Sequence, residues 1–288
     1  MMKGRKILIL GGTGMAGHLI YRFLEATKKY KLYNTVYRTK LTSDSIICNV
    51  HDEQLLKSII VEIKPDIVIN SVGALIRESK EHQSNAIFLN AYLPHLLKNL
   101  CDQVSAKLIH ISTDCVFSGS KGNYAVDDFR DANDMYGRSK ALGEITNDKD
   151  LTIRTSIIGP EIKLEGEGLF HWFMAQKDSV KGYTNAIWGG VTTLELAKAM
   201  EKAIDRNLTG LIHLTNGEPI SKYKLLGVLK EEFKRNDIII QPFESAKVDK
   251  SLSTSASIDI QVPSYIKMIA NLKIWMKKHP ELYTNYHF

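Results

Sequence analysis

A short apolar run, a glycine-rich loop and an amphipathic stretch follow one another near the N-terminus. Ile7–Leu10 is uniformly apolar, which predicts a strand buried on both faces, as in a parallel sheet. The loop 11–17 reads Gly-Gly-Thr-Gly-Met-Ala-Gly, and helical spacing of apolar residues follows from His18 to Tyr30. A strand, a glycine loop and a helix in this order are typical of a site for the pyrophosphate of a dinucleotide.

Each of three glycines in this loop suits a separate task. Gly11 permits the tight turn, Gly14 lets the backbone approach a pyrophosphate, and Gly17 lets the helix pack against the strand. The helix N-terminus offers free N–H groups to the phosphates. The loop residues that we expect at the cofactor are Gly11, Thr13, Gly14, Met15, Ala16 and Gly17.

Strand and helix patterns alternate through the first half of the chain. Further strands are predicted at 35–37, 45–50, 66–70, 107–111 and 151–156, with helices at 53–63, 85–104 and 136–144. This alternation predicts an α/β fold, a Rossmann-type doubly wound parallel sheet, in residues 1–155. Residues 156–288 carry shorter elements, and we expect them to form mainly a smaller C-terminal α/β substrate-binding lid, with about 185–206 returning to the first domain.

The end of the second predicted strand indicates which cofactor is used. Arg38 stands where an acidic residue would bind the ribose hydroxyl of NAD, and Lys40 follows it with no acid before Asp44. An arginine here accommodates the 2′-phosphate, so we predict NADPH, with NADH as the alternative. The other expected cofactor contacts are Asn49, Val50, Ser71, Val72, Gly73 and Asn90.

Composition excludes some classes of function. The net charge is +6, but the 38 basic residues are spread among 32 acidic ones without a basic run, which argues against nucleic acid as a partner. Three cysteines without metal-ligand spacing suit a reduced compartment and predict no metal site. The N-terminal apolar run is too short for a signal peptide or a membrane span, so we expect a cytoplasmic protein, with a homodimer as one open alternative for its assembly.

Tyr136 and Lys140 have three residues between them, which places them on one face of a helix, about one turn apart. Such a pair is common on protein surfaces. It can also be an acid and its electrostatic partner, since a nearby cation favours the phenolate. Thr113 adds a hydroxyl at the carboxyl end of the fifth predicted strand, where this architecture places its chemistry.

Two motifs carry a family resemblance. They are Ser112-Thr113-Asp114-x-Val116-Phe117-x-Gly119 and Tyr136-Gly137-x-Ser139-Lys140-x-x-Gly143-Glu144. With the glycine loop, they resemble the extended short-chain dehydrogenase/reductases, in particular the dTDP-4-dehydrorhamnose reductase branch. The resemblance covers most of the chain and is strongest from residue 7 to 160.

The resemblance implies roles for the matching residues. Tyr136 would protonate the C4 oxygen of a nucleotide-linked 4-keto-6-deoxyhexose while NADPH delivers hydride, in the service of surface polysaccharide synthesis. Lys140 would hold the nicotinamide ribose and keep the tyrosine pKa low, and Thr113 would hydrogen-bond the same oxygen. The residues implied at the substrate are Cys115, Val116, Phe117, Asn185 and Trp188.

Several alternatives stay open. Cys115 follows Asp114 where dehydratases of this superfamily have a second acid, which argues against elimination. Cys115 and His171 are similar in position to an acid/base pair of epimerase/reductases, so a bifunctional 3,5-epimerase/4-reductase is one alternative. A catalytically idle, cofactor-binding regulatory subunit is another. The sugar nucleotide could be dTDP-linked or a UDP-2-acetamido-2,6-dideoxy-hexulose.

Overall fold

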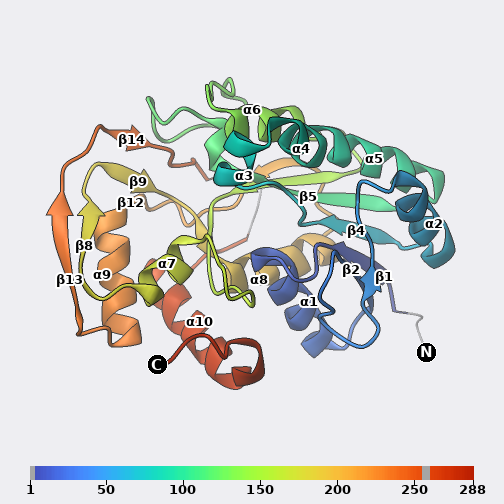
Figure 1. The fold of residues 1–288 in the computed structure, drawn as a ribbon. Helices are drawn as coiled ribbons and strands as arrows, with labels where there is room; N and C mark the ends of the chain where they lie inside the picture. The colour runs from blue at the N-terminus through green and yellow to red at the C-terminus, as the bar shows by residue number, and fades with distance from the viewer. Residues whose placement is uncertain (1–3, 255–259) are drawn as a thin grey trace.

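A seven-stranded parallel sheet forms the centre of the protein, in a computed structural model that describes residues 4–254 and 260–288 (Figure 1). The strand order is β11-β6-β5-β4-β1-β2-β3. The strands are β1 (Lys6–Leu10), β2 (Lys31–Val36), β3 (Ile46–Ile47), β4 (Ile67–Asn70), β5 (Lys107–Thr113), β6 (Leu151–Thr155) and β11 (Gly210–His213). The order 3-2-1-4-5-6 is that of a doubly wound dinucleotide fold, which confirms the predicted α/β class.

Helices cover both faces of this sheet. In Figure 1, α1 (Met15–Thr27) and α8 (Thr193–Asp205) lie on one face, and the other face carries a layer of helical segments. That layer consists of α2 (Glu53–Ile63), α3 (Ile76–Glu81), α4 (Gln83–Ala86), the π-helix η1 (Ile87–Tyr92), α5 (Leu93–Gln103) and α6 (Met135–Leu142).

The apolar run of β1 shows why the strand must be buried on both sides. Ile7 and Ile9 pack into the cluster under α1 and α8, whereas Leu8 and Leu10 pack into the cluster under α2 and α5. Successive side chains of a strand point to opposite faces, so a uniformly apolar strand needs a cover on each. All four are fully buried, and burial of each stabilises the fold by ~1.5–3 kcal/mol.

The register brings the strand ends to one edge. Leu10 of β1 pairs with Thr35 of β2 on one side and with Asn70 of β4 on the other, and Thr113 of β5 pairs with Thr155 of β6. The loops after these strands therefore meet at the carboxyl edge of the sheet, where ligands bind in such folds.

The second half of the chain forms a smaller α/β assembly beside this edge, seen around α9 and β13 in Figure 1. Its elements are β7 (Ile157–Ile158), α7 (Leu169–Ala175), β8 (Asp178–Tyr183), β9 (Ala186–Trp188), β10 (Val191–Thr192), β12 (Ile220–Ser221), α9 (Lys222–Phe233), β13 (Ile238–Phe243), β14 (Val248–Asp249), α10 (Tyr265–Lys278) and the 3-10 turn η3 (Pro280–Leu282). Within this half, α8 and β11 belong to the main sheet and its cover. The division near residue 155 stays a prediction.

Several predicted elements differ from the observed ones, among them α6, which spans Met135–Leu142 rather than 136–144, and β3, which is only Ile46–Ile47 of the predicted 45–50. Helix α1 begins at Met15 rather than His18, because Gly14 is its N-cap and Gly17 is accommodated inside the helix. The helix ends at Thr27. The helix predicted over 85–104 is three segments, with a π-helix between α4 and α5. Pro94 has no N–H to donate to the carbonyl four residues earlier, that of Asn90, so the regular ladder is interrupted there.

Candidate active site

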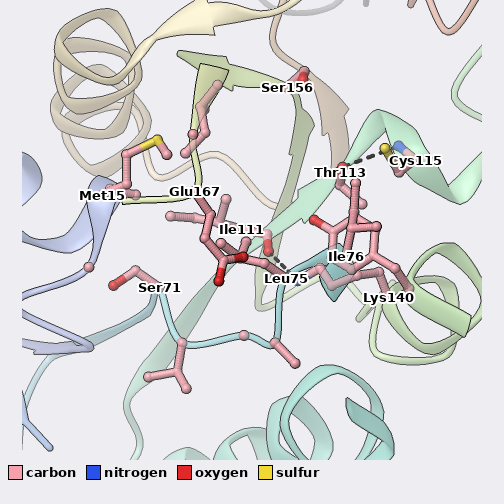
Figure 2. A pocket seen from close by; sticks show the side chains of 18 of the residues that line it. Met15, Ser71, Leu75, Ile76, Ile111, Thr113, Cys115, Lys140, Ser156 and Glu167 are labelled. Carbon is pink, nitrogen blue, oxygen red and sulfur yellow. Dashed lines mark hydrogen bonds between the residues drawn. The ribbon is translucent and has the colours of Figure 1, made fainter. Parts of the chain in front are cut away.

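A cavity of about 410 Å³ opens at the carboxyl edge of the sheet (Figure 2). Its walls come from the glycine loop, the segments after β4, β5 and β6, helix α6 and the loop before α7. Of the predicted site residues, it brings together Thr13, Gly14, Met15, Ala16, Ser71, Val72, Gly73, Thr113, Cys115, Tyr136 and Lys140.

The glycine loop has the shape that a pyrophosphate cradle requires. Gly11 has a φ of +78°, which favours glycine, and a Cβ on Gly17 would lie 2.1 Å from the carbonyl oxygen of Gly11. Gly14 caps α1 without a side chain, so the first N–H groups of the helix stay open toward the cavity. The residues present therefore fit a dinucleotide cofactor.

Helix α6 is held close to the end of β5. The Asp134 carboxylate caps the helix by accepting the Gly137 N–H at 2.9 Å. A Cβ on Gly137 would lie 2.2 Å from the Cys115 carbonyl oxygen, so only glycine permits this approach. The result is that Lys140 faces the cavity on the same side as Thr113 (Figure 2), and Tyr136 lines the cavity with them.

Hydrogen bonds orient Lys140 and Thr113. Lys140 Nζ donates to the Ile111 carbonyl at 2.8 Å. The Thr113 hydroxyl donates to Asp114 at 3.1 Å and accepts the Cys115 N–H at 3.1 Å (Figure 2). The Tyr136 phenol lies close enough to the Thr113 hydroxyl for that group to lower the phenol pKa. A carbonyl oxygen placed beside Thr113 and Tyr136 would thus meet two hydroxyl groups.

Burial sets the protonation of the pair. Desolvation raises the pKa of the Tyr136 phenol, and the nearby Cys115 raises it further, against the Thr113 hydroxyl that lowers it. This direction is opposite to the lowering expected from Lys140. The phenol therefore keeps its proton at neutral pH, as an acid must. Desolvation also lowers the pKa of Lys140 to about 8.

Six predicted cofactor residues do not line the cavity: Gly11 and Gly17 of the glycine loop, Arg38, Asn49, Val50 and Asn90. Arg38 and Asn49 are exposed, with the Arg38 guanidinium stacked 4.7 Å from the centre of the Tyr37 ring. Val50 packs on the second core cluster. Asn90 is fully buried, accepts the Ala74 N–H at 2.9 Å and donates to Ser139 Oγ at 3.1 Å, so it braces the walls rather than facing the cavity.

Four of the residues implied at the substrate also lie elsewhere. Val116 and Phe117 are fully buried in a small cluster where Phe117 stacks on Tyr124, which leaves them no surface toward the cavity. Asn185 donates to the Ser245 carbonyl at 3.3 Å outside the cavity lining. Trp188 is buried and reaches the cavity indirectly, because its indole N–H donates to Ser156 Oγ at 2.8 Å.

Cys115 and His171 are not brought together as an acid/base pair. Cys115 lines the cavity, but desolvation and the Asp114 charge raise the pKa of its thiol to about 12. His171 is absent from the cavity lining, and its Nδ1 lies 2.9 Å from the Tyr286 hydroxyl.

Sequence reasoning missed part of the cavity wall. The missed residues are Ala74, Leu75, Ile76, Ile111, Ser112, Thr155, Ser156, Ile157, Glu161, Lys163, Glu167 and Gly168. Those next to β5 and β6 follow from the rule that strand ends meet at one edge. The loop before α7 has no periodicity or motif that would have marked it.

The residues that the structure describes contain no cluster of three or more His, Cys, Asp or Glu side chains suited to a metal ion. None of the helices in residues 4–254 and 260–288 combines the length and apolarity that a membrane crossing requires.

Comparison with known proteins identifies the family. The profile of the RmlD substrate-binding domain matches residues 5–265. The chain belongs to this family. This result and the structural likenesses below confirm the resemblance to the extended reductases of the dTDP-4-dehydrorhamnose reductase type.

Solved structures share this fold. A hypothetical dTDP-4-dehydrorhamnose reductase from Sulfolobus tokodaii is 25% identical, with a TM-score of 0.77 over 90% of this chain and 98% of that one. A dTDP-4-dehydrorhamnose reductase from Bacillus anthracis, in complex with NADP, has a TM-score of 0.80 over 94% and 99% of the two chains at 19% identity.

Two kinds of protein are found among the curated relatives of this chain. Spore coat polysaccharide biosynthesis protein SpsK of Bacillus subtilis is 26% identical over 234 residues, covering 79% of each chain. Methionine adenosyltransferase 2 subunit beta of Xenopus laevis is 23% identical over 258 residues, covering 85% of this chain and 77% of its own length.

Proposed function

We propose that this protein is an NADPH-dependent oxidoreductase that reduces the 4-keto group of a nucleotide-linked 6-deoxyhexulose. The observation that carries the proposal is that one cavity is lined by the glycine loop, Thr113, Tyr136 and Lys140. The family and the likeness to dTDP-4-dehydrorhamnose reductases support it, as does the relative named for spore coat polysaccharide biosynthesis.

In this proposal each residue acts at a stated place. NADPH supplies a hydride when it is bound. The protonated Tyr136 phenol donates its proton to the C4 oxygen, and the Thr113 hydroxyl hydrogen-bonds the same oxygen. Lys140 contributes its positive charge beside the phenol, which favours the phenolate that remains after transfer. Arg38 lies after β2, where it is available to the 2′-phosphate of the cofactor.

A panel of substrates tests this function. Purified protein is mixed with NADPH and, in turn, dTDP-, UDP-, GDP- and CDP-linked 4-keto-6-deoxy sugars, and NADPH absorbance is followed. We expect turnover of a dTDP- or UDP-linked sugar. Absence of turnover with every sugar, in protein that binds NADPH, would contradict the proposal.

A second function has its own support. The likeness to subunit beta of a methionine adenosyltransferase favours a regulatory, cofactor-binding subunit. This alternative predicts NADPH binding without oxidation and a stable complex with a methionine adenosyltransferase catalytic subunit, which co-purification at defined stoichiometry would detect.

A further inference from the structure

Two rows of polar side chains cross the sheet beneath the end of α6. In one row Ser112 of β5 pairs with Arg154 of β6, which pairs with His213 of β11. In the other row His110 of β5 pairs with Thr152 of β6. Paired residues of adjacent parallel strands project from the same face, so both rows point toward the helix layer. Polar groups in a sheet interior require partners, and the segment after α6 provides them for Ser112, Arg154 and Thr152.

Glu144, two residues beyond α6, is the centre of the first row. Its side chain is fully buried, and four N–H or O–H groups donate to its two oxygens. Arg154 donates from Nε to Oε1 at 2.9 Å and from Nη2 to Oε2 at 2.7 Å. Ser112 Oγ donates to Oε1 at 2.7 Å, and Arg130 Nη1 donates to Oε2 at 3.0 Å. Such a fully satisfied, bidentate arrangement fixes one geometry.

The same segment is held by the second row. Thr152 Oγ1 donates to the Ile145 carbonyl at 2.7 Å and accepts the Ile145 N–H at 3.1 Å. The chain on both sides of Glu144 is therefore fixed: Lys140 is one turn earlier in α6, and Ile145 is bonded to β6. Glu144 cannot move without moving the C-terminal end of the helix.

Two adjacent residues of β5 bond to this unit. The Ile111 carbonyl accepts from Lys140 Nζ at 2.8 Å, and the Ser112 hydroxyl donates to Glu144. The next residue is Thr113, which lines the cavity with Lys140 and Tyr136. This two-point contact determines how far Thr113 lies from α6.

We infer that Glu144 is a positioning residue for the reduction proposed above: with Arg154 it fixes the end of β5 against α6 and so holds Thr113, Tyr136 and Lys140 in register. The inference rests on the proposed function for its kinetic consequences. A buried ion pair by itself is weak evidence for stability, because well-packed apolar side chains often serve as well. The bond from Ser112, beside Thr113, is what connects this pair to the cavity.

Charge adds a second consequence. The titratable groups around Lys140 are His110 from β5, Tyr136 from its own helix and Glu144 after it, with Arg154 and Arg130 on the far side of Glu144. Burial and the Lys140 charge lower the pKa of His110 well below its usual value, so His110 is neutral. Burial lowers the pKa of Lys140 to about 8, and the Glu144 charge opposes this. Loss of that charge therefore moves the Lys140 titration to lower pH.

Three variants of the full chain test the inference. Glu144→Gln keeps the shape and removes the charge. Ser112→Ala removes one bond and leaves the ion pair, so it decides the question if Glu144→Gln does not fold. Asp150→Asn is the matched control: its carboxylate is also fully buried and accepts the Leu108 N–H at 2.8 Å, but at the opposite edge of the same strands.

We expect Glu144→Gln and Asp150→Asn both to lower the melting temperature. In folded protein, Glu144→Gln and Ser112→Ala each lower kcat about tenfold or more. Their NADPH affinity stays within about twofold of wild type. Asp150→Asn keeps kcat within about twofold of wild type. In Glu144→Gln the alkaline limit of the kcat profile moves to lower pH. Unchanged kcat in folded Glu144→Gln and Ser112→Ala would overturn the inference.

A readout without turnover separates this inference from the proposed function. The pH dependence of Lys140 acetylation by acetic anhydride, followed at the Lys140 peptide by mass spectrometry, reports the amine titration in wild type and in Glu144→Gln. If wild type reduces no keto sugar, the proposed function fails, and the Lys140 titration decides the placement of Glu144 on its own. A titration at the same pH in both proteins would overturn it.

Discussion

The imidazole of His18 joins the glycine loop to the C-terminal segment: its Nε2 lies 3.1 Å from the hydroxyl of Tyr283, and its Nδ1 lies 2.8 Å from the carbonyl oxygen of Gly14. A carbonyl only accepts, so Nδ1 carries the proton and Tyr283 donates to Nε2. The ring is fully buried and neutral in this arrangement. A segment 265 residues away along the chain thus supports the backbone that faces the cofactor side of the cavity.

The His18 ring predicts an acid sensitivity. Desolvation lowers its pKa from 6.5 to about 4, so between these values the unfolded chain binds a proton that the folded protein does not. The contribution of His18 to the free energy of unfolding is therefore fully present above pH 6.5. As the pH falls toward 4, ~3 kcal/mol of this contribution is lost. Urea unfolding at pH 7 and at pH 4.5 measures how much unfolding free energy is lost between the two pH values. This loss should be smaller in His18→Gln than in wild type. The exposed His82→Gln serves as control, and equal losses in His18→Gln and wild type would contradict the assignment.

Tyr136→Phe tests the proton donor. The change removes one hydroxyl from the cavity wall, and we expect kcat/KM for the correct sugar nucleotide to fall ~10²–10⁴-fold, as for loss of a positioned acid. NADPH affinity and melting temperature should stay close to wild type. Tyr92→Phe, at an exposed tyrosine of η1, controls for the loss of a phenol. Normal turnover in Tyr136→Phe would exclude the proposed chemistry.

The parts of the fold that follow from local patterns were predictable. The apolar run of β1 must be buried on both faces, and the glycine loop must lie between a strand and a helix, so the parallel sheet and its carboxyl-edge site followed from residues 7–17. The end of the fifth predicted strand also placed Thr113 at that edge, whereas Tyr136 was joined to the site by the family resemblance. The π-helix arises because Pro94 cannot donate to the Asn90 carbonyl. The residues at which such a segment begins and ends are poorly predicted from sequence.

The parts of the site that depend on packing were not predictable. Phe117 lies in a motif beside Thr113, but its ring turns into the cluster with Tyr124 and beneath the Arg154 guanidinium. The short 3-10 turn η2 (Asp114–Val116) follows Thr113. The sequence does not indicate which side of this turn faces the cavity. Trp188 similarly contacts the cavity wall through a bond to Ser156, which only the folded arrangement reveals.

Arg38 predicts the choice of cofactor. Its exposed guanidinium stacks on Tyr37 after β2, and a 2′-phosphate is the part of NADPH that such a side chain distinguishes from NADH. Arg38→Ala should weaken NADPH binding about tenfold and leave NADH binding unchanged, measured by fluorescence titration of each cofactor. Lys277→Ala, an exposed cation on α10, controls for the loss of a positive charge. An equal loss for both cofactors would show that Arg38 does not read the phosphate.

Trp188 and Ser156 predict a coupled effect on substrate binding. The indole N–H holds the Ser156 hydroxyl in the cavity wall, whereas the ring packs in the core 5.6 Å from the Tyr265 ring. Trp188→Phe retains most of that packing and removes the bond, so KM for the sugar nucleotide should rise about threefold to tenfold with NADPH affinity unchanged. Ser156→Ala should give a similar rise. Because both changes remove the same bond, the double variant should be no worse than the poorer single one. Additive effects on KM would mean that the two side chains act on the substrate independently.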